Sequence, residues 1–168
     1  MVLATALFAA VVSQSKSIEL TPGLVITKTS TVKREVFNRI SADNEGKTGA
    51  ITIRGNGITV NFNGATLLGT GWHRDPDSRR GTALLIEGKN ITIKNLNAHG
   101  YKIGMIARNV PGLRVLNCDF SYNWKQKLQS TLDKEDSSDW MSFHKNENDE
   151  WLQFGAGIYL RGCNGFEI

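Results

Sequence analysis

Hydrophobic and polar residues alternate along short stretches of this chain, and one such pattern occurs four times. Each copy begins with the last residue of a short apolar strand, followed by a charged residue and a corner that contains Gly or Asn. An alternating strand such as Ile58-Thr59-Val60 comes next. Alternation with period two predicts strands with one buried face. A repeat of this kind buries that face only by stacking on neighbouring copies. The copies begin at Ile53, Ile86, Ala107 and Leu160.

The spacing of the copies predicts two insertions. The copies begin 33, 21 and 53 residues apart in turn, and 21 indicates the bare repeat. The surplus falls at about residues 69–81 and 122–155. Insertions in stacked repeats form loops on the side of the stack, often at the binding face. We therefore expect the functional surface near these two segments.

An asparagine corner is expected after the repeat strands. Asn95 and Asn117 occupy the same position in consecutive copies. Stacked Asn side chains can bond to each other and to the backbone of a tight corner. Phe62 takes this position in the first copy, so the ladder is expected to begin one copy later.

The N-terminal part lies outside the repeat. Residues 1–17 contain an apolar run followed by small polar residues, as in a secretory signal, although a charged start is missing. The alternative is a segment that caps the end of the stack. Residues 18–47 carry short strand patterns and predict an atypical first coil. The run is too short to span a bilayer comfortably, so no stable membrane span is expected.

The repeat resembles the right-handed parallel β-helix of pectate-lyase-like and other carbohydrate-active proteins. The resemblance rests on residues 157–168, Gly-Ile-Tyr-Leu-Arg-Gly-Cys-Asn-Gly-Phe-Glu-Ile, and residues 116–121, Leu-Asn-Cys-Asp-Phe-Ser. It implies an all-β domain over residues 18–168, with about three to four coils, an N-terminal cap and two insertions. Residues 122–155 also resemble an insertion of longer, exported bacterial β-helix proteins. The fourth copy ends in mid-strand, so a truncated N-terminal piece is expected.

Charge and cysteine content restrict the partners only slightly. The chain has a net charge of +4, but residues 125–151 hold seven acids and four lysines. The remainder is therefore basic, which favours anionic partners such as acidic polysaccharide. No dense Lys/Arg cluster or nucleic-acid motif is visible, so nucleic acid is not an expected partner. Cys118 and Cys163 fall at different repeat positions and are expected to be buried free thiols.

The insertions contain most of the candidate site residues, and Arg161 of the fourth copy completes the set. Exposed indoles stack on sugar rings, and nearby charged groups bond the hydroxyls. The alternative for the aromatic residues is that they anchor long loops onto the stack. The substrate-binding candidates are Trp72, Trp124, Trp140, Trp151 and Arg161.

The second insertion also carries acid–base residue types. Glycosidic hydrolysis needs two carboxyls across a bond, and lyase or epimerase chemistry needs a base beside a uronate. His144, Glu147 and Asp149 are the catalytic candidates, with a solvated acidic loop as the alternative. Calcium binding is an alternative role for this acidic stretch, because calcium takes several oxygen ligands. No EF-hand or nonapeptide calcium repeat is present in the sequence, so no metal or other cofactor is expected.

Two functions follow from these features. The first is a secreted or periplasmic β-helix protein that acts on or binds polysaccharide. Its reaction type is left open between lyase, hydrolase and epimerase. The second is a non-catalytic surface or glycan-binding module. A helper protein for metal or cofactor insertion is a third interpretation, which the scarcity of Cys, Met and His clusters disfavours.

Overall fold

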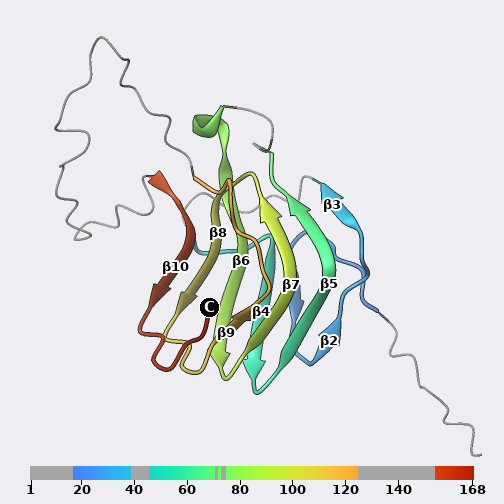
Figure 1. Ribbon diagram of the computed structural model, residues 1–168, viewed down its shortest axis with the longest axis vertical. Coiled ribbons are helices and arrows are strands. Elements are labelled where there is room, and N and C mark those ends of the chain that lie inside the picture. Colours follow the sequence, from blue (N-terminus) through green and yellow to red (C-terminus); the bar gives the residue numbers. More distant parts are fainter. Residues whose placement is uncertain (1–16, 39–45, 71, 73–74, 125–153) are drawn as a thin grey trace, which may run out of the picture.

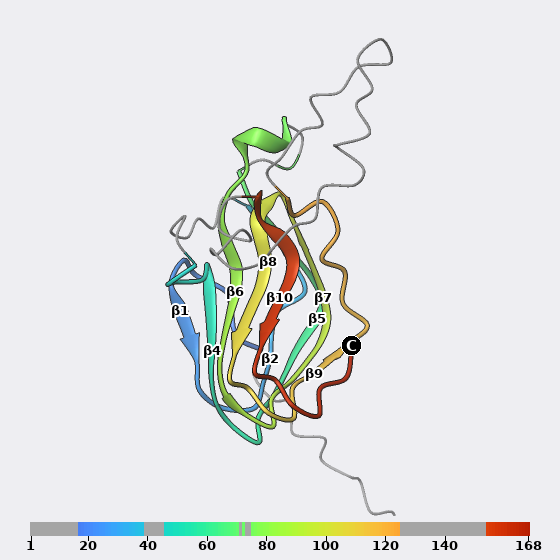
Figure 2. The same ribbon diagram turned by 90° about the vertical axis from the view of Figure 1, so that its left-hand side faces the viewer.

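The described part of the chain consists almost entirely of parallel β-strands. The structure is a computed structural model that describes residues 17–38, 46–70, 72, 75–124 and 154–168. The strands form two sheets that face each other as two layers (Figures 1 and 2). Every strand pair within these sheets is parallel. The expectation of an all-β domain is therefore confirmed.

The chain alternates between the two sheets as it advances. One sheet contains, in spatial order, β1 (Leu24–Ile26), β4 (Ile51–Asn56), β6 (Arg80–Lys89), β8 (Tyr101–Arg108) and β10 (Ala156–Arg161). The other contains β2 (Ser30–Thr31), β5 (Thr59–Leu68), β7 (Thr92–His99) and β9 (Arg114–Leu116), and β3 (Val36–Asn38) also pairs with β5. A single 3-10 turn, η1 (Pro76–Ser78), lies ahead of β6 in the described residues. Each copy of the sequence motif thus leads from a strand of the first sheet toward the second.

The register of the first sheet is the register of the sequence motif. Ile53 pairs with Ile86, Ile86 with Ala107, and Ala107 with Leu160. In the second sheet, Ile93 of β7 pairs with Val60 on one side and Val115 on the other. A shift of one residue would turn every apolar side chain outward, so burial of one face fixes this pairing.

The core fills the space between the sheets. Ile53 and Ile86 of the first sheet and Val60 and Ile93 of the second lie in one buried cluster. Phe62 also lies in it and has no solvent exposure. Burial of such side chains stabilises the fold by about 1.5–3 kcal/mol each. The stacked layers therefore share one continuous core.

An asparagine ladder runs along the second sheet. The side-chain amide of Asn117 donates to Asn95 at 2.8 Å, and that of Asn95 donates to Asn61 at 2.9 Å. The predicted stacking of Asn95 on Asn117 is confirmed. The prediction that the ladder begins only after the first copy is wrong, because the pairing shifts between Asn61 and Ala65 and brings Asn61 of the first copy into the ladder.

The N-terminal residues 18–38 form the first layer of both sheets. Strand β1 pairs with β4, and strands β2 and β3 pair with β5. These short strands thus occupy one edge of each sheet, whereas residues 1–16 lie outside the described part of the chain. In the described part of the chain, no helix is long and apolar enough to cross a membrane.

Both cysteines are free, as expected. Cys163 is buried and its thiol approaches the Ala107 carbonyl oxygen at 3.5 Å. Cys118 is only half-buried, so the expected burial holds fully for Cys163 alone. Partial burial raises the pKa of the Cys118 thiol, which keeps it protonated and unreactive at neutral pH.

Candidate functional site

Three successive layers of the second sheet end at one corner of the molecule, at the upper edge of the sheets where the β7 arrow ends in Figure 1. The Gly69 backbone N–H donates to the His99 carbonyl at 2.8 Å, and the Gly100 N–H donates to the Tyr122 carbonyl at 3.1 Å. These bonds stack the segments that follow β5, β7 and β9. Four aromatic side chains lie in these segments or at the end of β7, and we call them the aromatic corner: Trp72, His99, Tyr122 and Trp124.

Three of these rings are in mutual contact. The Trp72 and His99 ring centroids lie 4.8 Å apart with a tilt of 40°, and Tyr122 meets Trp72 edge-on at 5.1 Å and 87°. The Tyr122 and His99 centroids are 6.2 Å apart. Tilted and edge-to-face pairs of this kind stabilise by about 0.5–1.5 kcal/mol beyond area burial. The rings therefore form a packed platform.

The outer part of this platform faces solvent. Tyr122 is 63% exposed and Trp124 is 42% exposed. Tyr122 also has a φ of 55°, in the left-handed region that bulky residues rarely adopt. Such a conformation costs about 1–3 kcal/mol and persists where surrounding structure enforces it, most often at functional sites. The backbone thus holds an exposed tyrosine in a strained position.

Asn123 enforces the position of its neighbour Tyr122. Its side chain is 3% exposed and makes three hydrogen bonds to backbone groups. Its carbonyl oxygen accepts from the Tyr101 N–H at 2.9 Å, and its amide donates to the carbonyls of Ala98 and Phe120 at 2.5 and 2.9 Å. A buried amide with these partners locks the corner because each partner would otherwise lack a bond.

A glycine permits the close approach of two layers. Gly100 has a φ of +78°, and a Cβ added there would lie 2.7 Å from the Trp72 backbone nitrogen. Any side chain at this position would push Trp72 outward. The contact between Trp72 and His99 therefore depends on the absence of a side chain at Gly100.

Polar groups lie beside the rings. His99 Nδ1 is 3.0 Å from the Ser121 carbonyl oxygen, and its Nε2 is 3.6 Å from an Asp119 carboxylate oxygen. Since a carbonyl can only accept, Nδ1 carries the proton and Nε2 faces the carboxylate. Hydrogen bonds from the backbone N–H and the hydroxyl of Ser121 lower the pKa of Asp119, so this carboxylate is ionised at neutral pH.

Arg79 connects the first insertion to Trp124. The Arg79 side chain is buried and donates to the Trp124 carbonyl oxygen at 3.0 Å. Burial lowers the pKa of its guanidinium, which nevertheless remains a cation. The backbone of Trp124 is thereby tied to the residue that precedes β6, while its indole stays partly exposed.

The structure places the predicted site residues in three groups. Trp72 and Trp124 lie at the aromatic corner, where the half-buried Trp72 packs against the His99 and Tyr122 rings. Arg161 ends β10 at the opposite end of the strands, so it does not join them. The other candidates lie outside the described residues: Trp140, His144, Glu147, Asp149 and Trp151.

Several residues of the corner were not predicted as a site. These are Arg79, Asp119, Ser121, Tyr122 and Asn123. Part of the corner could have been found by extending the register of the motif beyond β9, which the bridge between Asn97 and Asp119 follows. That register brings Ser121 opposite His99. Tyr101, which begins β8 next to His99, is fully buried in the core and does not belong to the exposed part of the corner.

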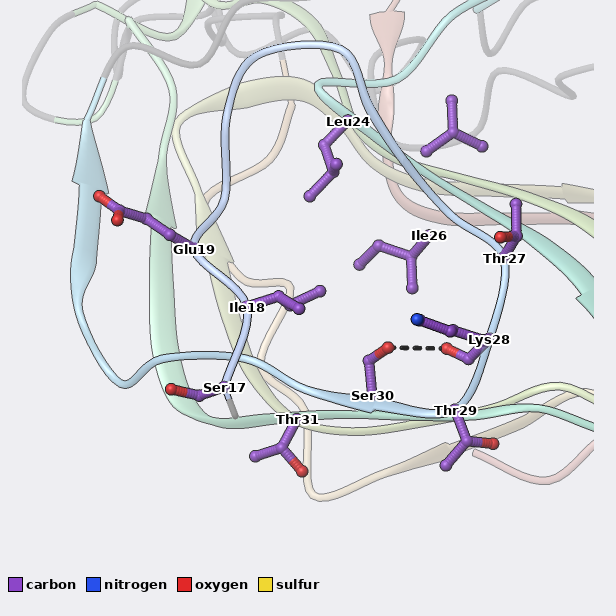
Figure 3. A pocket seen from close by; sticks show the side chains of 11 residues that line it. Ser17, Ile18, Glu19, Leu24, Ile26, Thr27, Lys28, Thr29, Ser30 and Thr31 are labelled. Atoms are coloured by element: carbon purple, nitrogen blue, oxygen red, sulfur yellow. Dashed lines mark hydrogen bonds between the residues drawn. The ribbon is translucent and has the colours of Figure 1, made fainter. Parts of the chain in front are cut away.

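A second candidate is a hollow of about 790 Å³ at the first layer. Figure 3 shows Ile18, Leu24 and Ile26 pointing into the loop that residues 17–31 form, with Glu19 pointing away. Ser30 donates to the Lys28 carbonyl at 2.8 Å on its rim. The lining is mainly apolar and belongs to the end of the stack, where core side chains have no further described layer above them. We therefore treat the aromatic corner as the stronger candidate.

Neither metals nor relatives assign a function. Among the described residues, no group of three or more His, Cys, Asp or Glu side chains could hold a metal ion. The chain matches no protein-family model, no curated protein and no solved structure with which it was compared. The functional argument therefore rests on the geometry of the corner.

Proposed function

We propose that the chain is a right-handed parallel β-helix that binds polysaccharide at the aromatic corner. The alternation of strands between two parallel sheets supports the β-helix, because each return to the first sheet adds the next parallel neighbour. Crossovers between parallel strands of one sheet are right-handed in nearly all proteins. Export is part of the proposal, since the apolar run in residues 1–17 has the composition of a secretory signal.

The observation that carries the proposal is the strained, exposed Tyr122 beside Trp124. An exposed aromatic face stacks on the apolar face of a sugar ring. The Asp119 carboxylate and the Ser121 hydroxyl lie next to the rings and can bond sugar hydroxyls. A rigid aromatic surface with adjacent hydrogen-bonding groups is the usual composition of a carbohydrate site. The geometry favours binding and supplies no bond-cleaving pair among the described residues.

The proposal is tested by titrating the protein with a panel of neutral and acidic oligosaccharides by calorimetry. We expect Tyr122→Ala and Trp124→Ala each to weaken binding about tenfold, the equivalent of about 1.4 kcal/mol for one lost aromatic contact. Phe166→Ala is the matched control, since Phe166 is an aromatic residue of 54% exposure outside the corner. An equal loss in all three variants, or no binding across the panel, would contradict the proposal.

The same panel tests the enzyme hypothesis. Release of reducing or unsaturated ends, abolished by His144→Ala or Glu147→Gln, would show that the protein cleaves a glycosidic bond. Binding without release would favour the non-catalytic module. Because this readout uses products and the calorimetry uses binding, the two questions are answered separately.

A further inference from the structure

The outer face of the second sheet carries a row of polar side chains next to the aromatic corner. This polar row contains one residue from each of three adjacent layers: Thr66, Asn97 and Asp119. Thr66 lies between the buried residues Ala65 and Leu67, and Asn97 likewise lies between two buried residues, so both side chains face away from the core. Neighbouring strands lie about 4.8 Å apart, and the polar row therefore extends roughly 10 Å across the layers.

The polar row adjoins the aromatic corner. Asn97 and His99 are two residues apart in β7, so their side chains share one face of the sheet. At about 3.3 Å per residue, the polar row lies roughly 6.6 Å from the level of His99. Asp119 already contacts the corner, since its carboxylate oxygen is 3.6 Å from His99 Nε2. The polar row is therefore a continuation of the corner toward the other end of β7.

The side chains of the polar row are only weakly bonded to one another. The Asn97 amide reaches the Thr66 hydroxyl at 3.5 Å, at the long limit for a hydrogen bond. One oxygen of the Asp119 carboxylate accepts from the Ser121 N–H at 2.8 Å, and 52% of the Asp119 side chain is exposed. A ligand can therefore bond these groups without displacing a strong internal hydrogen bond.

Polar side chains elsewhere on the second sheet are bonded more tightly. Asn61 Oδ1 accepts from the Asn63 N–H and from the Asn95 amide, both at 2.9 Å. Arg114 and Glu167 form an ion pair at 2.6 Å at the end of the sheet away from the corner. A ligand at those places would have to replace existing bonds, which removes most of its net gain. The polar row lacks this competition and lies beside the exposed rings.

We propose that the polar row binds the hydroxyl groups of a neutral glycan chain whose adjacent sugar ring stacks on the aromatic corner. This inference rests on the proposed binding of polysaccharide at the corner, and it adds a second sugar position and a charge preference. Hydroxyl, amide and carboxylate groups all form hydrogen bonds with sugar hydroxyls. Asp119 is the charged member of the polar row, and a uronate carboxylate placed against it would be repelled. The glycan chain therefore runs along β7 and presents hydroxyls to the polar row.

The test titrates the whole chain with methyl glycosides of single sugars and with the hexasaccharides of cellulose, xylan, mannan and amylose. Hexagalacturonate is the acidic probe, and nuclear magnetic resonance measures weak and strong binding alike. We expect at least one neutral hexasaccharide to bind more tightly than its methyl glycoside and than hexagalacturonate. Thr66→Val and Asn97→Ala should each weaken hexasaccharide binding about fivefold, as expected for one lost neutral hydrogen bond, and leave the affinity for the methyl glycoside unchanged.

Thr92→Val is the matched control for Thr66→Val. Thr92 is a half-buried threonine near the other end of β7, and the substitution removes the same hydroxyl. It should change the affinity for the hexasaccharide less than about twofold. Asp119→Asn removes the charge at nearly constant size, so it should reduce the preference for the neutral chain over hexagalacturonate. An unchanged preference would contradict the argument from charge.

The remaining outcomes separate this inference from the proposal on which it rests. Equal losses in Thr66→Val and Thr92→Val, or equal affinities for methyl glycosides and hexasaccharides, overturn the inference. Tighter binding of hexagalacturonate than of every neutral hexasaccharide also overturns it. In each of these cases the polysaccharide site at the corner stands if Tyr122→Ala weakens binding. Absence of binding to every probe overturns both.

Discussion

The strongest test of the corner is the replacement of Asn123 by alanine. The substitution removes three hydrogen bonds and leaves the Tyr101 N–H and the carbonyls of Ala98 and Phe120 without this partner. An unsatisfied buried polar group costs about 1–3 kcal/mol. Some of this cost is relieved by water that enters the space left by the side chain. We therefore expect the free energy of unfolding to fall by about 3–5 kcal/mol.

Urea denaturation followed by far-ultraviolet circular dichroism measures this loss. Asn97→Ala is the matched control, because Asn97 lies in β7 of the same layer and its amide makes one long contact, at 3.5 Å with the Thr66 hydroxyl. We expect the control to lose about 0.5 kcal/mol or less. A loss of less than about 1 kcal/mol in Asn123→Ala, or equal losses in the two variants, would refute the assignment of Asn123 as the residue that locks the corner.

Three further predictions concern neighbouring residues. Tyr101→Phe should stabilise the protein by about 1 kcal/mol in the same urea assay, since the buried Tyr101 hydroxyl has no hydrogen-bond partner among the described residues. Burial also raises the pKa of this hydroxyl, and a destabilised variant would contradict the prediction. Gly100→Ala should destabilise by about 2 kcal/mol or more through the clash with Trp72, seen as a lower thermal midpoint and altered tryptophan fluorescence. Because the pKa of Asp119 is lower in the folded protein than in the unfolded chain, where it is about 3.9, the ionised carboxylate stabilises the fold above that pH. This contribution is lost as the pH falls through the folded pKa. Asp119→Asn should therefore lose less stability than the parent protein below about pH 4, as measured by urea denaturation.

The register of the sheets could be predicted from the sequence, for a physical reason. Alternating apolar residues allow only one pairing that buries them all, and the Gly or Asn corners fix where each strand begins. Ile53, Ile86, Ala107 and Leu160 consequently pair as the motif places them. The asparagine ladder followed the same logic from Asn95 onward.

The start of that ladder could not be predicted in this way. Three residues, 62–64, stand in β5 where β7 has only Asn95. Which residue then enters the core depends on packing between layers, and Phe62 fills the interior while Asn61 joins the ladder. Local periodicity contains no information on such a bulge, because it is decided by tertiary contacts.

The candidate site was predictable only in outline. The placement of Trp72 and Trp124 in insertions pointed to the correct region, since insertions in stacked repeats lie at one side. Tyr122 and Asn123 carry no motif, and their roles come from contacts with residues more than 20 positions away. A left-handed φ at a tyrosine is likewise visible only in the folded chain.

The strain at Tyr122 and the hydrogen bonds of Asn123 belong together. Rotation of Tyr122 to an ordinary backbone conformation would relieve about 1–3 kcal/mol but would move the adjacent Asn123 away from its buried partners. Losing those bonds costs more than the strain, so the exposed ring is held edge-on against Trp72. A ligand that stacks on this ring therefore pays little to order it. Asn123→Ala should reduce glycan binding even under conditions in which the variant remains folded, whereas a purely structural role for Asn123 would leave the affinity of the folded fraction unchanged.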